Sequence, residues 1–184
     1  KKLGNLKYSE TSLKNINKIN KNTRKFFDSK KILFGAISTH QSEEIFCTKI
    51  YLDLKKKYMN GITIIIPRHI DRASEIKEEI EKIGLKVHLH SSGMKIENKT
   101  DIYLVDTFGE TKLFLKICKI VFLGGSLIQH GGQNPLEAAR LGCKVIHGPN
   151  ISNFLEVYSL LNKNNISSKI RTISQAKGIV QKNL

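Results

Sequence analysis

The sequence has little that would mark a secreted, metal-bound or membrane-spanning protein. It has three cysteines among 184 residues, at Cys47, Cys118 and Cys143. They are isolated, odd in number and without the paired spacing of a zinc site, so we expect small core residues in a reducing compartment. No apolar run approaches the length of a membrane span and no signal peptide is visible, so we expect the chain to be soluble. Both methionines, Met59 and Met94, are internal, and we expect a fragment of a longer protein.

Acidic residues are also scarce. The chain has 16 Asp and Glu against 31 Lys and Arg, a formal net charge of +15. Such a charge favours anionic partners, either nucleic acid or a membrane surface. Most basic residues are lysines that accompany many Ile and Asn, a composition that an AT-rich genome also produces. A basic nucleic-acid-binding module would need a lysine-lined face with interleaved aromatic side chains, which the sequence lacks. That module therefore stays only an alternative, and we expect no nucleic-acid partner.

Short apolar runs alternate with amphipathic stretches along the chain. The β-branched run at 62–66 is typical of a strand that is covered on both faces, and apolar residues recur at helical spacing from 70 to 83, before Gly84. Strands are predicted at 32–37, 62–66, 85–90, 102–105, 120–123, 144–147 and 170–173. The alternation predicts an α/β fold, a Rossmann-like doubly wound parallel sheet. We further expect His88 and His90 on the strand surface and Ser174 as the cap of a last helix.

The stretch 120–150 carries the motif on which the functional prediction rests. A predicted buried strand at 120–123 is followed by two pairs of glycines, Gly124 with Gly125 and Gly131 with Gly132. A helix is then predicted to start at Asn134 and Pro135. Asn and Pro favour the first turn of a helix, and Glu137 stands where a capping box has its carboxylate. Free N–H groups and the positive end of a helix dipole suit this unit to bind an anion such as phosphate. An alternative stays open, in which the glycines only form tight turns and Glu137 caps its own helix.

The sequence GGSLIQHGGQNPLEAARLGCKVIHGPNISNF closely resembles the signature of the Kdo transferases. That family attaches 3-deoxy-D-manno-octulosonic acid (Kdo) to the lipid A precursor from a CMP-activated donor. The matched positions are Gly124, Gly125, Ser126, Gly131, Gly132, Asn134, Pro135, Leu136, Glu137, Gly148, Pro149, Asn153 and Phe154. Residues 4–7, Gly-Asn-Leu-Lys, also match a segment at the junction of the family's two domains.

The resemblance covers residues 4 to about 161 and implies the C-terminal half of a GT-B glycosyltransferase. Residues 1–10 would be the inter-domain linker and 11–184 the CMP-Kdo-binding domain, with the N-terminal acceptor domain absent from the chain. Lys7 matches the family's transition-state stabiliser, which would act electrostatically on the departing CMP. The positions that match the family's CMP contacts are Pro67, Arg68, Phe108, Gly109, Glu110, Asn134, Pro135, Leu136 and Glu137. Further donor contacts are expected from Ser38, His40, Gly125, Ser126 and Gly132.

Several of these residue types suit a nucleotide. The Arg68 guanidinium can hold phosphate or the cytosine edge through paired hydrogen bonds, and an apolar Phe108 could cover the base. Glu137 would accept hydrogen bonds from the ribose hydroxyls. For His40, a hydrogen-bonded structural imidazole is as good an interpretation as a ligand contact.

Three positions depart from the family pattern. Ser42 replaces Gly in Ser-Thr-His-x-Gly-Glu-Glu, and Gln133 and Asn150 each replace a common His, which puts any acid–base role at those two positions in doubt. The glutamates of the first motif, Glu43 and Glu44, suit the dipole of the helix that they begin.

The implied reaction is an inverting displacement at the anomeric carbon of CMP-Kdo, with the general base in the absent N-terminal domain. No metal is implied, because no Asp-x-Asp pair lies near the loop, and we expect no cofactor beyond the donor substrate. The implied partners are the lipid A precursor and an anionic membrane surface, at the cytoplasmic face of the bacterial inner membrane. We expect the fragment to bind CMP weakly without transferring Kdo. A GT-B enzyme with a UDP-linked donor is the nearer alternative.

Overall fold

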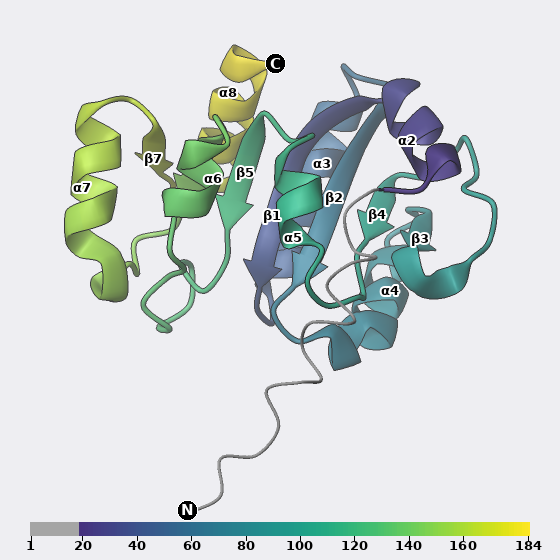
Figure 1. The fold of residues 1–184 in the computed structure, drawn as a ribbon, viewed down its shortest axis with the longest axis horizontal. Coiled ribbons are helices and arrows are strands. Elements are labelled where there is room, and N and C mark those ends of the chain that lie inside the picture. Colours follow the sequence, from purple (N-terminus) through teal and green to yellow (C-terminus); the bar gives the residue numbers. More distant parts are fainter. Residues whose placement is uncertain (1–18) are drawn as a thin grey trace, which may run out of the picture.

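A seven-stranded parallel sheet forms the centre of the protein, which a computed structural model describes over residues 19–184 (Figure 1). The strands are β1 (Lys31–Thr39), β2 (Gly61–Pro67), β3 (Val87–Leu89), β4 (Ile102–Leu104), β5 (Ile120–Leu123), β6 (Lys144–His147) and β7 (Ser167–Lys169). They lie in the order β3-β4-β2-β1-β5-β6-β7, and every neighbouring pair is parallel. The predicted doubly wound parallel sheet is confirmed.

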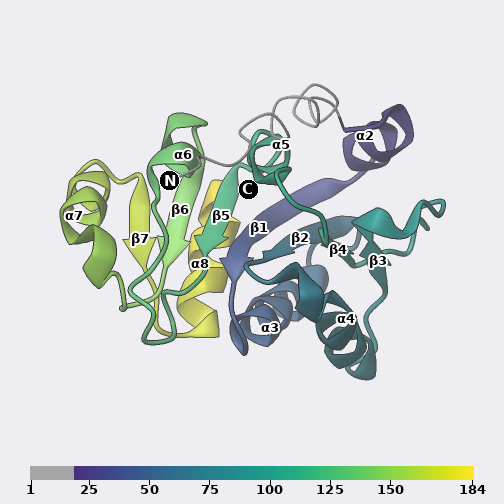
Figure 2. The ribbon, with the colours of Figure 1, turned by 60° about the horizontal axis from the view of Figure 1, so that its bottom comes forward.

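Helices cover both faces of this sheet (Figure 2). One face carries α3 (Glu43–Lys55), α4 (Ala73–Lys82) and α8 (Ile173–Asn183), and the other carries α2 (Lys21–Asp28), α5 (Thr111–Leu115), α6 (Leu136–Arg140) and α7 (Leu155–Lys163). Short 3-10 turns are η2 (Ile70–Arg72), η3 (His90–Ser92) and η4 (Ser152–Phe154). In β2, Ile65 packs toward α3, and Ile64 and Ile66 pack toward α2 and α5. The strand is therefore buried on both faces, as its β-branched run predicts.

The C-terminal elements differ from the prediction. The edge strand is β7, not 170–173, and Ile173 already begins α8. The cap of that helix is Thr172, whose hydroxyl oxygen accepts a hydrogen bond from the Gln175 amide at 3.2 Å, and not Ser174. The short polar strand β7 is defined by its pairing with β6. The apolar side chain of Ile170, which suggested a strand, is buried in the core just after β7 ends.

His88 lies on β3 and is half-buried, whereas His90 lies beyond the end of the strand. The ring of His88 stacks on Tyr103 with 5.4 Å between centroids. His90 begins η3, and its Nδ1 lies 2.6 Å from the Tyr103 hydroxyl oxygen while its Nε2 lies 3.1 Å from Glu110 Oε2. The prediction of a strand position was wrong for His90, because alternation along a strand does not reveal where the strand ends.

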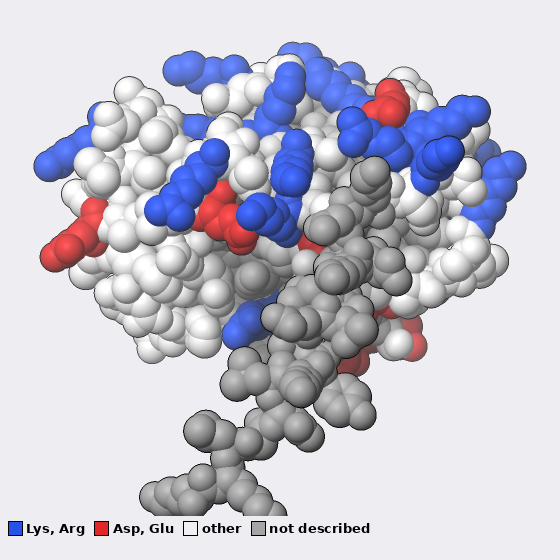
Figure 3. All heavy atoms as spheres, in the orientation of Figure 1, with Lys and Arg blue, Asp and Glu red and all other residues white. Residues whose placement is uncertain are grey.

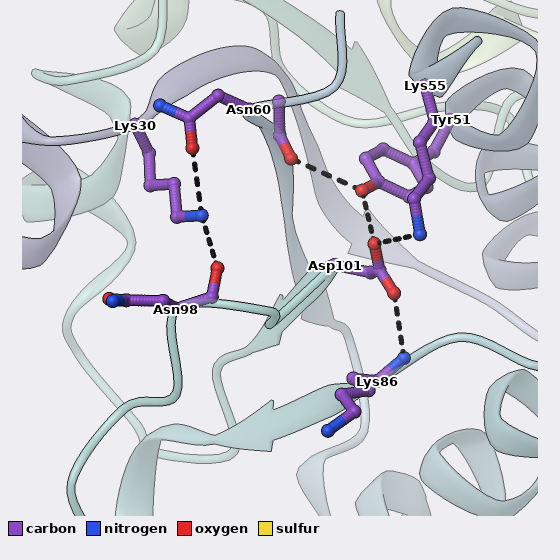
Figure 4. A network of polar contacts seen from close by, with 8 residues as sticks. Lys30, Tyr51, Lys55, Asn60, Lys86, Asn98 and Asp101 are labelled. Atoms are coloured by element: carbon purple, nitrogen blue, oxygen red, sulfur yellow. Dashed lines mark hydrogen bonds and ion pairs between the residues drawn. The ribbon is translucent and has the colours of Figure 1, made fainter.

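A buried carboxylate ties the amino ends of the strands together (Figure 4). Asp101, which precedes β4, accepts hydrogen bonds through Oδ1 from the Tyr51 hydroxyl and the Lys55 ammonium, both at 2.6 Å, and through Oδ2 from the Lys86 amide at 3.0 Å. Helix α3 is thereby fixed to the edge of the sheet opposite the functional loops.

Candidate functional site

The candidate site lies at the carboxyl ends of the strands, where the chain reverses its direction across the sheet. From β1 the chain proceeds to β2 and the β3–β4 edge, and it then crosses to β5 on the other side of β1. The loops that follow β1 and β5 therefore leave in opposite directions. Ligands of open α/β sheets bind in the crevice that such a reversal creates.

Glu43 joins these two loops. Its Oε2 accepts hydrogen bonds from the amides of His40 at 3.0 Å and Gly125 at 2.7 Å. Its Oε1 accepts from the amides of Ser126 at 3.1 Å and Leu127 at 2.9 Å. The glutamate has no exposed surface, and charge-assisted bonds of this kind are about twice as strong as neutral ones. The first half of the glycine loop thus surrounds a carboxylate of the protein itself.

Close backbone packing explains two of the glycines in this region without a ligand. A Cβ on Gly124 would overlap the Ser38 carbonyl oxygen, and a Cβ on Gly148 would overlap the carbonyl oxygen of Ser126. The Ser126 hydroxyl donates to the Leu123 carbonyl at 2.6 Å and accepts from the Gly148 amide at 2.8 Å. Ser126 is fully buried, so in this structure its side chain joins the ends of β5 and β6.

The second half of the glycine loop is anchored from its outer side. Gly131 and Gly132 have positive φ angles of 94° and 77°, which favour glycine. The Gly132 amide donates to the Gly125 carbonyl at 2.8 Å, and the Tyr158 hydroxyl donates to the Gln133 carbonyl at 2.9 Å. The loop is therefore held by a hydrogen bond between its own two halves and by a second hydrogen bond from α7.

At the start of α6, two predicted contacts are exposed. Asn134 Oδ1 accepts a hydrogen bond from the Leu136 amide at 3.0 Å, but the N-cap of α6 is Pro135, so Asn134 lies one residue before the cap position rather than at it as predicted. The described hydrogen bonds include none from Glu137 back to the Asn134 amide, so the capping box is not formed. Asn134 and Glu137 are both exposed, and Pro135 is buried between them.

Three imidazoles meet at the reversal point. The rings of His40 and His130 have centroids 4.4 Å apart, and those of His40 and His69 are 5.8 Å apart. Burial lowers the pKa of His40, as do His130, His69 and Arg68, while Glu43 raises it. Burial therefore favours the neutral form of the His40 imidazole.

The predicted contacts Phe108, Gly109 and Glu110 follow β4, which is separated from β1 by β2. Phe108 is 74% exposed, and Gly109 has a φ of 81°. Glu110 lies 3.1 Å from His90 Nε2 and also contacts the Thr107 hydroxyl. Pro67 and Arg68 end and follow β2, and Arg68 is exposed. These residues therefore follow strands at the same end of the sheet as the glycine loop, and the predicted Lys7 lies outside the described residues.

Sequence reasoning missed the structural roles of the adjacent glutamates. Glu44 is buried in an ion pair of 3.2 Å with Arg72, and burial raises its pKa although Arg72 opposes the change. A pair of acids at a helix start suggested only a favourable dipole, because no local pattern shows that β5 lies beside β1. A carboxylate at the start of the helix that follows a strand beside the reversal point is the feature that could have indicated Glu43.

Within residues 19–184, no group of His, Cys, Asp and Glu has the arrangement of a metal site. In the same range, none of the helices combines the length and the apolar character needed to cross a bilayer. The three cysteines are buried and free, as expected for core residues.

Comparison with known proteins gave consistent similarities, although no protein-family model matches the chain. The chain is 32% identical to the 3-deoxy-D-manno-octulosonic acid transferase of Haemophilus influenzae, over 86% of this chain and 37% of that protein. It is 34% identical to the transferase of the same name from Rickettsia prowazekii, over 92% of this chain and 36% of that protein. The chain thus spans little more than a third of these relatives.

Among solved structures, the fold resembles the crystal structure of the C-terminal CMP-Kdo binding domain of WaaA from Acinetobacter baumannii. The TM-score is 0.80 with 26% identity, and the alignment covers 88% of this chain and 83% of that one.

Proposed function

We propose that the chain is the donor-binding half of a Kdo transferase, which is a glycosyltransferase, because its curated relatives carry that name and its fold resembles a CMP-Kdo binding domain. The fold is that of a Rossmann-like GT-B half. The proposed activity is transfer of Kdo from CMP-Kdo to the lipid A precursor in lipopolysaccharide biosynthesis, by inversion and without a metal. Residues 11–184 would bind the donor, and residues 1–10 would lead from an acceptor domain that supplies the general base.

The observation that carries the proposal is the convergence of the matched motifs on one edge of the sheet. The loops after β4, β2, β1 and β5 lie side by side in that order. A nucleotide laid across them would meet Phe108 at one end and Glu137 at the other, with Arg68 between. Both end residues are exposed, and Arg68 offers a guanidinium to the phosphate. The ribose hydroxyls would donate hydrogen bonds to Glu137.

We place the phosphate beside the second half of the glycine loop rather than the first. The amides of Gly125, Ser126 and Leu127 already donate to Glu43, and a phosphate there would have to displace that carboxylate. No described hydrogen bond uses the amides of Gln133 or Asn134. Those N–H groups, just ahead of α6, are the better anion donors.

Titration calorimetry with CMP, UMP and UDP tests the proposal on the chain itself. Binding of CMP with a clear preference over the two uridine nucleotides is expected, and Arg68→Gln should weaken it about tenfold, as for a charged hydrogen bond. The matched control is Arg171→Gln, at an exposed position near α8. A chain that binds no CMP, or prefers UDP, would overturn the assignment and favour the UDP-sugar alternative.

We also propose that the face bearing α2 and α5 lies toward an anionic membrane. Lys and Arg gather over these helices (Figure 3). The exposed members are Lys21, Arg24, Lys25, Lys112 and Lys116, and the acid among them, Asp28, is paired with Arg24 at 3.3 Å. Each basic residue near an anionic surface contributes about 1 kcal/mol. Salt-sensitive flotation with phosphatidylglycerol vesicles but not with phosphatidylcholine vesicles is expected, and equal behaviour with both would reject the idea.

A further inference from the structure

The imidazole cluster at the reversal point has an atom whose chemistry is unused. His40 Nε2 is buried and has no hydrogen-bond partner. The backbone amide of the same residue donates to Glu43, which holds the start of this loop in place. A buried polar atom without a partner costs free energy, so such an atom in a ligand crevice indicates a group that arrives with the ligand.

The surroundings of His40 Nε2 show where that ligand group would lie. A Cβ on Gly125 would come within 3.4 Å of His40 Nε2 and 3.5 Å of the Gln133 side-chain nitrogen, and would press on the His130 ring. The three side chains therefore converge over Gly125, from the loop after β1 and from both sides of the glycine loop. A Cβ at position 125 would lie 2.8 Å from His130 Cδ2, so only glycine lets the His130 ring approach His40 and Gln133 this closely.

The charges around this point favour an anion. His130, His69 and Arg68 all act on His40 as positive or potentially positive neighbours. The one carboxylate in the group is Glu43, and four backbone amides already surround it. A neutral imidazole can donate through Nε2–H, and the Gln133 amide can donate as well. His40 Nε2 and the Gln133 side-chain amide thus offer hydrogen-bond donors to an anionic acceptor.

A Kdo donor carries two anionic groups, the phosphate and the carboxylate of the sugar acid. Both are attached to the same anomeric carbon, so their subsites must adjoin each other. Arg68 and the amides before α6 are proposed for the phosphate, and the His40 cluster lies between these elements. Neutral nucleotide sugars have no carboxylate at this position.

We propose that His40, with His130 and Gln133 beside it, binds the carboxylate of the donor sugar and so makes the site specific for an ulosonic acid. The inference rests on the proposed function, because it assigns a subsite within the same crevice. His40 acts as a specificity-determining residue, and the buried imidazole gains its missing partner when the donor binds.

The test compares the affinities of the 184-residue chain for CMP and CMP-Kdo by titration calorimetry. The wild-type chain should bind CMP-Kdo more tightly. His40→Leu should reduce that preference about tenfold or more, as expected for loss of a hydrogen bond to a charged group, while the affinity for CMP changes less than about twofold. His40→Gln, which keeps a donor, should retain part of the preference. His88→Leu, outside the crevice, is the matched control.

A second measurement does not depend on a variant. In NMR titrations of the wild-type chain, CMP-Kdo should raise the pKa of His40 more than CMP does and shift its ring signals, because a carboxylate directly beside the imidazole favours the protonated form more than a phosphate in the adjoining subsite. If His40→Leu fails to fold, this measurement alone settles the inference.

The outcomes separate the two proposals. Absence of binding to either ligand overturns both. A wild-type preference for CMP-Kdo that persists in folded His40→Leu, or a pKa of His40 that CMP-Kdo raises no more than CMP does, overturns the carboxylate subsite and leaves the donor-binding function standing.

Discussion

Replacement of Glu43 by Gln tests how the glycine loop is held. In the protein, Oε2 accepts from the amides of His40 and Gly125, and Oε1 accepts from those of Ser126 and Leu127. The substitution is nearly isosteric, but a carboxamide keeps one oxygen and turns an NH₂ group toward two of the four N–H groups. Those two donors would remain buried without an acceptor.

The magnitude follows from these two donors. Each unsatisfied buried N–H costs about 1–3 kcal/mol, so Glu43→Gln should lower the free energy of unfolding by about 2–6 kcal/mol. For a domain of this size each kcal/mol shifts the melting temperature by about 2–4 °C, and the expected fall is therefore about 4–24 °C. Domains are typically stable by only about 5–15 kcal/mol, so the loss would be a large part of the total.

Urea and thermal unfolding followed by far-UV circular dichroism measure this loss. Glu78→Gln, on the exposed face of α4, is the matched control and should change stability by less than about 0.5 kcal/mol. Hydrogen exchange should quicken at Gly125, Ser126 and Leu127 in the Glu43 variant only. A variant as stable as the control, with unchanged exchange at those amides, would refute the role assigned to the carboxylate.

Three further predictions concern stability. Ser42 has a φ of 75°, and Ser42→Gly should stabilise the protein by about 0.5–1 kcal/mol because glycine adopts this conformation without strain; an unchanged or lower urea midpoint would contradict this. Gly148→Ala should be strongly destabilising, since the new Cβ would overlap the Ser126 carbonyl oxygen. Gly178 lies in α8 with open space around it, so Gly178→Ala should raise the free energy of unfolding by about 0.5–1 kcal/mol. Melting temperatures that fall by the same amount in both variants would reject the packing argument. Burial lowers the pKa of His147 below 6.5, although its hydrogen bond to the Gly148 carbonyl opposes this. As the pH falls, the unfolded state therefore binds the proton before the folded state does, so the contribution of His147 to stability should be full above about pH 6.5 and decline below it. In His147→Gln, the urea midpoint should depend less steeply on pH between pH 8 and 5. An equally steep dependence would count against His147 as the cause.

Local patterns predicted the interior strands well. The uninterrupted apolar runs of β2 and β5 fix both the presence and the position of these strands, because a strand covered on both faces needs such a run. The polar edge strand β7 has no such run, so the prediction placed the strand at the more apolar residues 170–173 that follow it. Edge strands are defined by the neighbour that they pair with, which local propensity does not contain.

The residues of the candidate site stay predictions from the sequence, and their contacts needed the tertiary structure. Arg68, His40 and the glycine loop were identified from motifs and from their positions after strands. That Glu43 occupies the loop amides, and that His90 holds Glu110, depends on strands far apart in the sequence lying side by side.

By itself, the sequence determined the alternating α/β architecture and the family that the chain resembles, since hydrophobic periodicity and a long motif are both written in consecutive residues. Only the tertiary structure decided which glycine-loop amides are free and which imidazole lacks a partner. The order of the strands across the sheet places Glu43 and His40 against a loop more than eighty residues away, and no local periodicity specifies that order.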